Sequence, residues 1–379
     1  MSQKSAELKA QGVDVINLSV GEPDFNTPDH IKEAAKKAVD DNYSRYSPVA
    51  GYPALRKAIV AKLKKENGLD YTPEQIVCSN GAKQCVCNAV MALVSPGEEV
   101  IIPAPYWVSY PQMVLMADGK PVFVEAGIEQ DFKITPAQLE EAITARTKAI
   151  ILCSPSNPTG AVYSQAELEA LAEVLRRHEQ VYIISDEIYE HINYVGSHAS
   201  IARCEGMYDR TIVINGVSKA YAMTGWRIGF CAAPLALAKA CSKLQGQYTS
   251  GPCSVSQVAA TEAFAGPQEC VEEMRQAFER RKELIVRLAR EIPGLEVNEP
   301  HVAFYLFPQC SSYFGKRFGD KVIENSTDFA LYLLEHAHVA TVGGDAFGSP
   351  RCFRMSYATS DENIVEAMHR IKEALAELA

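Results

Sequence analysis

The sequence predicts an α/β protein in which helices cover a mostly parallel sheet, with a smaller α+β domain beside it. The prediction rests on three observations. Short apolar runs alternate with helical stretches in the middle of the chain, a long amphipathic helix follows, and strands mix with helices near the C-terminus. The length of 379 residues suits two domains better than one ordinary core.

Short apolar runs in the middle of the chain predict the strands of the sheet. These runs are Val100–Ile102, Ala149–Cys153, Val181–Ile184, Thr211–Ile214 and Ile228–Ala232. Continuous apolar strands are typical of a parallel sheet that is buried on both faces. The stretch Ser164–Arg177 begins with a serine cap and repeats leucine at helical spacing, which indicates a connecting helix.

The C-terminal third of the chain has a different pattern. A helix is predicted from about Pro267 to Glu291, ending at the turn Ile292-Pro293-Gly294. Strands are then expected at Phe304–Phe307, Val339–Val342 and Cys352–Ser356, and helices at Ser326–Glu335 and Glu362–Leu378. The strand Ile16–Val20 is expected to pack with this part. We therefore expect a large domain at residues 31–283 and a small domain made of residues 1–30 and 284–379.

Composition argues against several classes of protein. The net charge of −10 disfavours nucleic acid or an anionic membrane as the main partner. The eleven cysteines show neither a disulfide framework nor zinc spacing, so we expect reduced thiols, no metal site and a cytoplasmic location. No apolar run approaches a membrane span, and from the polar first residues, which have no apolar h-region, we expect no signal peptide.

Three polar residues follow three successive predicted strands. Asn157 lies after Ala149–Cys153, Asp186 after Val181–Ile184, and Lys219 after Thr211–Ile214. If each strand belongs to a β/α unit, all three lie at the carboxyl edge of the sheet, where open α/β sheets bind ligands. Alone, each would be read as a turn residue, a helix cap or a solvated lysine.

An amide, a carboxylate and an amine in this register suit pyridoxal phosphate (PLP). That cofactor needs a lysine for its aldehyde, an acid for its pyridine nitrogen, donors for its phenolic oxygen and a site for its phosphate. The turn Asn80–Gln84 follows the predicted strand Gln75–Ser79 and opens a helix. Free backbone N–H groups at such a turn bind anions, although this signal is weak by itself.

Four motifs resemble those of class I PLP-dependent aminotransferases. They are Asn215–Gly229 (NGVSKAYAMTGWRIG), Ser154–Gly160 (SPSNPTG), Ser185–Tyr189 (SDEIY) and Phe353–Ser360 (FRMSYATS). The similarity covers essentially the whole chain and is closest to the prokaryotic aspartate aminotransferase subgroup. The resemblance implies the fold of PLP-dependent transferases of fold type I, with a sheet of the seven-stranded type in the large domain.

The resemblance implies a role for each residue at the strand ends. Lys219 would hold PLP as a Schiff base and then act as the general acid and base of the proton shift. Asp186 would pair with the pyridine nitrogen. Asn157 and Tyr189 would bind the phenolic oxygen, with Tyr189 on the same face as Asp186 if a helical turn begins there. A packed helix tyrosine is an equal alternative for Tyr189.

Further cofactor contacts are implied around the phosphate and the ring. Arg227 would bind the phosphate as a bidentate donor, together with the helix start at Gly81, Ala82 and Lys83. Ser218 is expected beside the cofactor as well. Trp107 resembles the aromatic residue that stacks on the pyridine ring, although a tryptophan is more often a core residue.

The substrate is implied by a second group of residues. Arg354 resembles the arginine that binds the substrate α-carboxylate, and Gly21 lies near the substrate in relatives, as do Trp107 and Asn157. Lys83 resembles the lysine that reaches a distal carboxylate. The resemblance therefore implies amino acids and 2-oxo acids as partners, with aspartate and 2-oxoglutarate favoured.

Other readings of the chain remain open at this stage. Aromatic or prephenate transamination, alone or with aspartate, uses the same fold, and so does carbon–sulfur lysis; Lys83 would distinguish them, because a purely aromatic pocket has no use for it. A transcriptional regulator with an aminotransferase-like domain is disfavoured by the absence of a basic patch.

The resemblance also implies a homodimer. Tyr46 resembles the tyrosine that reaches the phosphate of the neighbouring subunit's cofactor, whereas the alternative is a tyrosine in a surface loop. Relatives usually have residues ahead of the position of Met1 that form an arm to the partner subunit. We assign no contacts to that arm.

Overall fold

A seven-stranded sheet organises the larger part of the chain, as seen in the computed structural model, which describes residues 2–379. The strands follow the spatial order β2-β8-β7-β6-β5-β3-β4. In chain order they are β2 (Ile76–Asn80), β3 (Glu99–Ala104), β4 (Lys120–Glu125), β5 (Thr147–Cys153), β6 (Tyr182–Asp186), β7 (Thr211–Gly216) and β8 (Ile228–Ala232). Only β8 runs against its neighbours, so the prediction of a mostly parallel sheet is confirmed.

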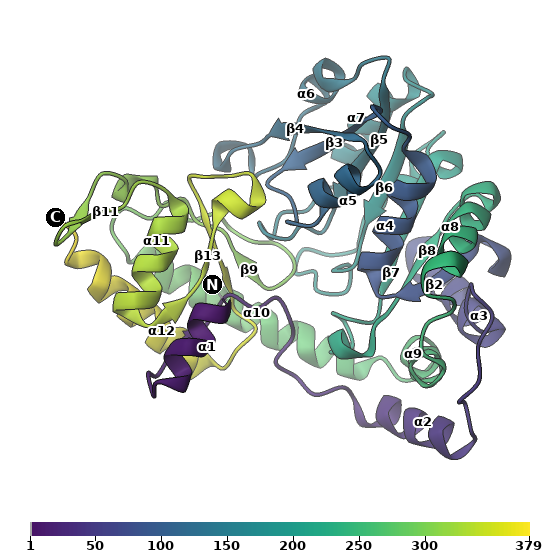
Figure 1. Cartoon of the computed structure of the whole chain (residues 1–379), viewed down its shortest axis with the longest axis horizontal. Helices are drawn as coiled ribbons and strands as arrows, with labels where there is room; N and C mark the ends of the chain where they lie inside the picture. The colour runs from purple at the N-terminus through teal and green to yellow at the C-terminus, as the bar shows by residue number, and fades with distance from the viewer. Residues whose placement is uncertain (1) are drawn as a thin grey trace.

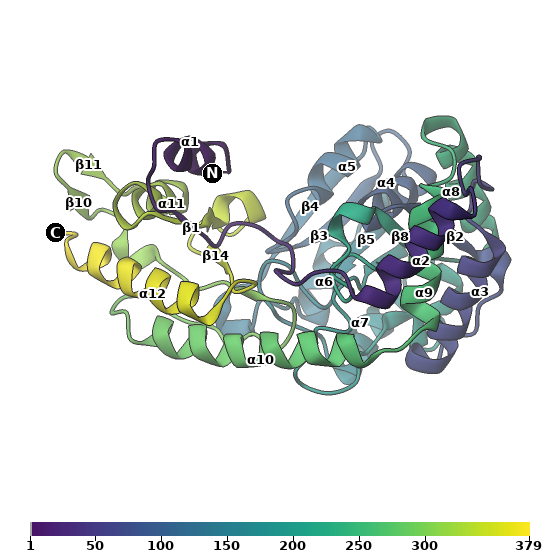
Figure 2. The ribbon, with the colours of Figure 1, turned by 90° about the horizontal axis from the view of Figure 1, so that it is seen from below.

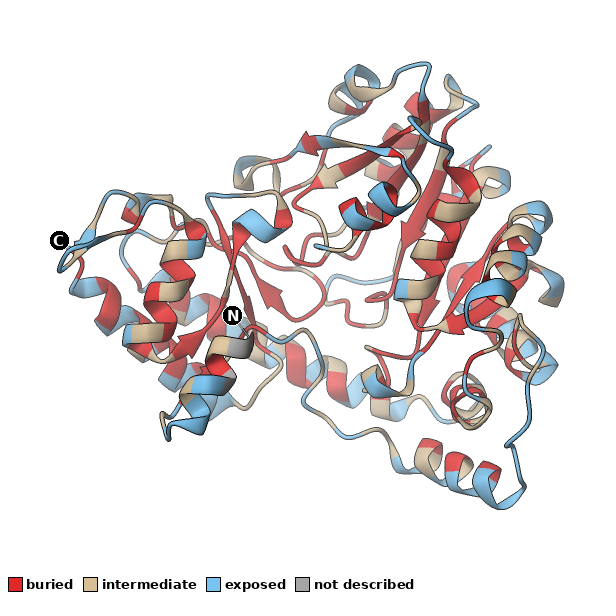
Figure 3. Cartoon of the chain, in the orientation of Figure 1, coloured by how far each residue is buried: buried red, intermediate tan, exposed pale blue. Residues whose placement is uncertain are grey.

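Helices cover both faces of this sheet, as Figure 1 shows. Alternate residues along each strand face opposite sides. In β5, Ala149 and Ile151 face the core beneath α4 (Ala82–Leu93), α5 (Tyr110–Met116) and α8 (Leu235–Tyr248). Ile150 and Leu152 face the core beneath α7 (Gln165–Arg176). Apart from the edge strand β4, the strands are buried along most of their length (Figure 3), as a sheet between two helical layers requires.

The remaining helices of the larger part lie on the face of the sheet that α7 covers. They are α2 (Asp29–Asp40), α3 (Pro53–Lys62), α6 (Pro136–Ala142) and α9 (Ser254–Ala265). Residues of α2, α3 and α9 share one apolar cluster with β2, β7 and β8.

Two of the predicted β/α units are wrong. No α-helix connects β6 to β7 or β7 to β8; turns and short 3₁₀ segments do so within the described residues. Asp186, at the end of β6, and Lys219, three residues beyond the end of β7, are therefore followed by turns rather than by connecting α-helices. Apolar run length predicts a buried strand but carries no information about the connection that follows it.

The smaller part contains short strands and helices around a core that also includes Ile188, Tyr189 and Ile192 of the larger part. Its strands are β1 (Ile16–Asn17), β9 (Tyr305–Leu306), β10 (Arg317–Phe318), β11 (Lys321–Val322), β12 (Val339–Ala340), β13 (Val342–Gly343) and β14 (Phe353–Ser356). Its helices are α1 (Ser2–Ala10), α10 (Glu269–Arg290), α11 (Ser326–Tyr332), which continues as a π-helix over Leu333–Ala337, and α12 (Asp361–Ala376).

Two predicted strands of this part differ in the structure. Ile16–Val20 is a strand only over Ile16–Asn17, where it pairs with β12. Val339–Val342 is divided, because β12 pairs with β1 whereas β13 pairs with β14. The backbone changes partner at Thr341, which belongs to neither strand. A change of pairing partner leaves no signal in a continuous apolar run.

Helix α10 belongs to both cores. Val271 near its start packs with the cluster that holds α2, α3 and α9. From Met274 to Ala289 the buried face packs in the core of the smaller part, beside α12, as Figure 2 shows. None of the helices in residues 2–379 is both long and apolar enough to span a membrane.

Candidate active site

A cavity of about 630 Å³ lies at the carboxyl ends of the parallel strands, between the two parts of the chain. Most of the residues that the sequence singled out line it: Gly21, Ala82, Lys83, Trp107, Asn157, Asp186, Tyr189, Ser218, Lys219, Arg227 and Arg354. Gly81 lies directly before Ala82 and against Arg227. Tyr46 is outside the cavity, with 96% of its surface exposed.

Lys219 projects into the cavity from the turn after β7. Its Nζ donates a hydrogen bond of 2.6 Å to the carbonyl oxygen of Gly21, in the N-terminal segment. Burial lowers the pKa of Lys219 to about 8, with Glu22 opposing the shift and the guanidinium groups of Arg354 and Arg227 adding to it. An amine with such a pKa can be a nucleophile and can exchange protons near neutral pH.

Asp186 ends β6 on the floor of the cavity. Its Oδ2 accepts a hydrogen bond of 2.6 Å from the hydroxyl of Tyr110, and Oδ1 accepts one of 3.3 Å from the backbone N–H of Ile188. Burial raises the pKa of Asp186, and these two hydrogen bonds oppose the rise. No lysine or arginine in the described chain forms an ion pair with Asp186, so a protonated ring nitrogen would suit it as a partner.

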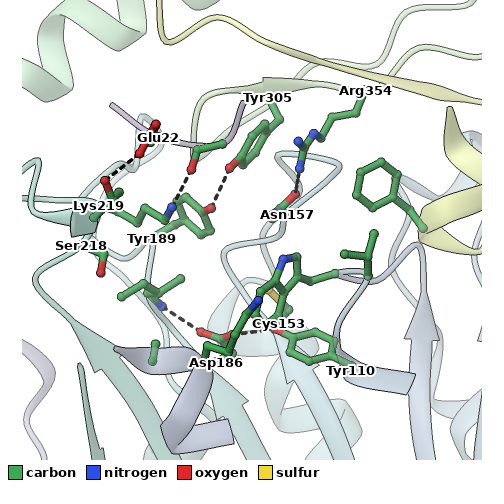
Figure 4. A pocket seen from close by; sticks show the side chains of 18 of the residues that line it. Glu22, Tyr110, Cys153, Asn157, Asp186, Tyr189, Ser218, Lys219, Tyr305 and Arg354 are labelled. Atoms are coloured by element: carbon green, nitrogen blue, oxygen red, sulfur yellow. Dashed lines mark hydrogen bonds between the residues drawn. The ribbon is translucent and has the colours of Figure 1, made fainter. Parts of the chain in front are cut away.

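Tyr189 faces Tyr305 across the boundary between the two parts. Their hydroxyl oxygens are 2.8 Å apart, as Figure 4 shows. Tyr189 lies in a hydrogen-bonded turn, in which the N–H of Glu190 donates to Glu187 and that of Ile192 donates to Tyr189. Burial raises the pKa of Tyr189 well above its ordinary value, so its hydroxyl stays protonated and can donate.

Arg354 enters the cavity from β14 in the smaller part. Its Nη1 donates to Oδ1 of Asn157 and its Nη2 to the carbonyl of Ser19, both at 2.8 Å. The guanidinium lies between two rings, 4.6 Å from the centroid of Tyr305 and 4.9 Å from that of Phe347. Among residues 2–379 no carboxylate pairs with it, and its buried Nε has no hydrogen-bond partner. It is therefore available to an external carboxylate.

Arg227 and the start of α4 form a cradle for an anion. Arg227 adopts a left-handed backbone conformation (φ 58°) and donates hydrogen bonds to the carbonyl oxygens of Thr224 and Asn80. Gly81 has φ of 80°, and a Cβ there would lie 2.3 Å from Nη2 of Arg227. Glycine thus permits the guanidinium to approach the first N–H groups of the helix, where a phosphate binds well.

Lys83 occupies the next position of α4 on the cavity wall. Its Nζ lies 4.9 Å from the ring centroid of Trp107, and Trp107 packs edge-on against Tyr110 at 5.3 Å. The lysine is exposed and forms no ion pair within the described part of the chain. A cation held over an aromatic face at the cavity wall can meet a second negative charge of a ligand.

These residues fit PLP on several counts. The cavity combines an amine of lowered pKa, a buried carboxylate that lacks a cation, a phenol donor and a glycine-dependent anion cradle. These are the groups that PLP requires for its aldehyde, its ring nitrogen, its phenolic oxygen and its phosphate. The sequence missed Tyr110, Tyr305 and Phe347, which support Asp186, Tyr189 and Arg354. Their motifs are apolar and aromatic, so they read as core positions.

Comparisons with known proteins give a consistent result. The family model described as Aminotransferase class I and II matches residues 13–371. A protein named aspartate/prephenate aminotransferase from Cereibacter sphaeroides is 52% identical, over 100% of this chain and 96% of its own length.

Solved structures resemble the chain equally closely. The aspartate aminotransferase from Rhizobium meliloti has a TM-score of 0.97 and 46% identity, covering 100% of this chain and 95% of that one. The aspartate aminotransferase from Thermus thermophilus with maleate has a TM-score of 0.92 and 42% identity, covering 98% and 95%.

Proposed function

The chain belongs to the class I and II aminotransferases, which makes it a PLP-dependent transaminase, and we propose that its substrates are L-aspartate and 2-oxoglutarate. In this reaction the amino group of aspartate is transferred to the cofactor and then to the oxo acid in two half-reactions. Relatives named for aspartate, and a relative crystallised with the dicarboxylate maleate, support the proposal.

The observation that carries the proposal is the presence of two cations on the walls of one cavity. Arg354 is buried between two rings, and no carboxylate among residues 2–379 pairs with it. Lys83 lies on the other part of the chain, over Trp107. A substrate with two carboxylates can satisfy both cations, whereas a monocarboxylic amino acid satisfies only Arg354. Aspartate and glutamate are the common amino acids of that kind.

The site residues then have complementary tasks. When bound, PLP supplies an aldehyde that captures the amino group and a ring that accepts electron density. We infer that Lys219 would hold the cofactor. Its amine would afterwards move a proton between the α-carbon of the amino acid and the aldehyde carbon of the cofactor, for which a pKa near neutrality is suited. Asp186 keeps the ring nitrogen protonated, and Tyr189 and Asn157 donate to the phenolic oxygen. Arg227, with Gly81, Ala82 and Ser218, would hold the phosphate.

Closure of the smaller part over the cavity is a further element of the proposal. Gly21 and Arg354 come from the regions 1–30 and 284–379, whereas Lys219 and Asp186 come from residues 31–283. We propose these regions as the small and large domains, with α10 shared between them. Binding of a carboxylate to Arg354 would draw the small domain toward Lys219 and exclude water.

We propose a homodimer in which Tyr46 completes the partner's site. Its side chain is 96% exposed and lies outside the cavity of its own subunit. A phenol in that position cannot serve the site of its own chain, and a second copy would cover its ring and give its hydroxyl an acceptor.

Prephenate is the second candidate substrate. The name of the relative from Cereibacter sphaeroides includes it. Prephenate is an oxo acid with a ring and a second carboxylate, so it could also use both Arg354 and Lys83. The aromatic residues Trp107, Tyr305 and Phe347 would contact its ring.

The first half-reaction tests the proposal directly. The visible absorbance of the bound cofactor should be bleached by aspartate and glutamate, and Lys83→Met should reduce kcat/KM for these acids by about tenfold to a hundredfold while sparing alanine and phenylalanine. Lys148→Met is a matched control, because Lys148 also lies over a ring, 5.5 Å from Tyr182, on β5. Equal losses for all amino acids would contradict the proposed role of Lys83.

A further inference from the structure

The turn that follows β6 has two sides. Asp186 and Tyr189 line the cavity, whereas Glu187 and Glu190, each one position further along, do not. Both glutamates are nearly inaccessible, with side chains 1% and 3% exposed. Two buried carboxylates therefore lie directly behind the two residues that would contact the cofactor ring.

Glu187 is held by three donors. Its Oε1 accepts hydrogen bonds from the hydroxyls of Ser185 at 2.8 Å and Ser200 at 2.7 Å. Its Oε2 lies 2.8 Å from Nε2 of His198. The carboxylate consequently has a fixed orientation, and it fixes the strand end that carries Asp186.

Glu190 is held from a different element. The ammonium of Lys62, the last residue of α3, donates to its Oε1. Asn67 donates to its Oε2 at 2.6 Å and also accepts from Lys62 at 2.8 Å. The side chain of Lys62 is 1% exposed, so this is a fully buried contact.

Lys62 pairs with Glu190, and Nδ1 of His191 lies 3.6 Å from the same carboxylate oxygen. Ligand atoms of Glu187, Glu190 and His198 lie within 4.8 Å of one another. Without a cation, two buried carboxylates at this separation would repel each other. Glu66 lies at the edge of the cluster, 3.6 Å from Nζ of Lys62 and 2.9 Å from Nε2 of His191.

We propose that Lys62, acting through Glu190 and beside Glu187, is a positioning residue for the transamination reaction. It holds the turn after β6 in the conformation that directs Asp186 and Tyr189 into the cavity. Removing the ammonium leaves the carboxylate of Glu190 with Asn67 as a hydrogen-bond donor but no lysine, so Glu190 either takes up a proton or moves with the turn that carries it. A shift of that turn displaces the acid that faces the ring nitrogen and the phenol that faces the phenolic oxygen together.

The inference rests on one part of the proposed function, that PLP binds in this cavity, and is independent of the substrate. Its test therefore measures binding of PLP rather than turnover. Purified protein is stripped of PLP, and its dissociation constant is measured by quenching of tryptophan fluorescence, to which Trp107 in the cavity wall contributes. The pH midpoint of the absorbance change of the bound cofactor gives a second readout. If the parent protein binds no PLP, the proposed function fails before Lys62 is tested.

Lys62→Met and Glu190→Gln separate positioning from a long-range electrostatic effect. The two variants change the local charge in opposite directions, so a simple field effect would move the dissociation constant in opposite directions. Displacement of the turn predicts that both variants raise it, by about tenfold. The double variant Lys62→Met/Glu190→Leu removes both the ammonium and the carboxylate that it neutralises. It should therefore bind PLP more tightly than Lys62→Met alone.

Glu99→Gln is the matched control for a purely structural effect. Glu99 is also buried, with a side chain 3% exposed, and is held by Arg146 at 2.8 Å and Thr144 at 2.6 Å. It starts β3, at the end of the sheet away from the cavity. This variant should lower the melting temperature and leave PLP binding within about twofold of the parent.

The proposal is overturned if Lys62→Met and Glu190→Gln behave like Glu99→Gln, with lower melting temperatures but unchanged PLP binding and pH midpoint. Opposite changes in the dissociation constant would overturn it as well. If Lys62→Met does not fold, Glu190→Gln and the double variant decide the result by the same two readouts.

Discussion

The guanidinium of Arg354 and the side-chain amide of Asn157 are joined by a hydrogen bond of 2.8 Å across 197 positions of sequence. The bond connects β14 of the smaller part to the loop after β5, and both residues line the same cavity. Nη1 and Nη2 each use one hydrogen for Asn157 and Ser19, so the bond orients the guanidinium while leaving it donors for a carboxylate.

Arg354→Lys should reduce kcat/KM for aspartate by about a hundredfold to a thousandfold. An ammonium is a point charge that cannot donate to Asn157, to the carbonyl of Ser19 and to a substrate carboxylate with the same planar geometry. Steady-state kinetics provides the measurement, with most of the loss expected in KM. The exposed Arg351, three positions earlier, gives the control Arg351→Lys. Similar kinetics for both variants would show that Arg354 does not bind substrate.

Gly81→Ala should weaken PLP binding by about tenfold or more, because its Cβ would collide with the Arg227 guanidinium. Gly97 has nearly the same backbone angle, φ of 82°, but nothing within 4 Å of an added Cβ. Gly97→Ala therefore places an alanine at a positive φ without the collision. Equilibrium dialysis of PLP with both variants separates the two effects. Equal affinity in the two variants would show that Arg227 and the start of α4 do not bind the phosphate of PLP.

Tyr110→Phe should reduce kcat by about tenfold, because Asp186 loses its shortest hydrogen bond. Without the hydroxyl the pKa of Asp186 rises further, and a carboxyl group that retains its own proton is a poorer partner for a protonated ring nitrogen. Tyr106→Phe is the control, since Tyr106 stacks on Phe123 and leaves Asp186 untouched. An unchanged kcat in Tyr110→Phe would mean that Ile188 alone orients the carboxylate.

The stability of the cofactor-free protein should depend on pH through Lys219. Its pKa is about 8 in the folded protein and 10.5 ordinarily, so the unfolded chain binds this proton more tightly. The free energy of unfolding therefore rises with pH between these values. We expect Lys219→Met to be more stable than its parent below pH 8, by on the order of 3 kcal/mol, with the difference shrinking up to pH 10.5.

Urea denaturation of the two cofactor-free proteins at about pH 7 and about pH 10 measures this difference. Other titrating groups are common to both proteins, so they cancel in the comparison. A difference that is constant with pH would show that the amine of Lys219 is not shifted by burial.

The strands were predictable from sequence because burial on both faces leaves continuous apolar runs. Ile228–Ala232 coincides with β8, and Val181–Ile184 differs from β6 by one residue at its start and two at its end. The direction of β8 was not predictable, since antiparallel pairing with β2 and β7 depends on a short turn rather than on strand composition. The division of Val339–Val342 was missed for a different reason, because its two halves pair with strands from other segments of the chain.

The polar half of the site was predictable and the aromatic half was not. Asn157, Asp186 and Lys219 stood at strand ends, where polar residues are conspicuous beside apolar runs. Tyr305 and Tyr110 lie within apolar surroundings, and only the fold places their hydroxyls against Tyr189 and Asp186. The buried anchors Glu187 and Glu190 were likewise hidden, because their partners His198 and Lys62 come from separate segments.

Helix α10 has a mechanical consequence for the proposed closure. Its first turn, around Val271, packs in the core of the larger part, whereas its face from Met274 to Ala289 packs in a cluster that joins the small domain to Ile188, Tyr189 and Ile192. We expect the helix to move with the small domain as a lever whose fulcrum lies near Val271. A rigid lever of 22 residues is about 33 Å long. Small rotations at the fulcrum thus become displacements of several ångströms at its far end, and bulky substitutions near Val271 would restrict the whole movement.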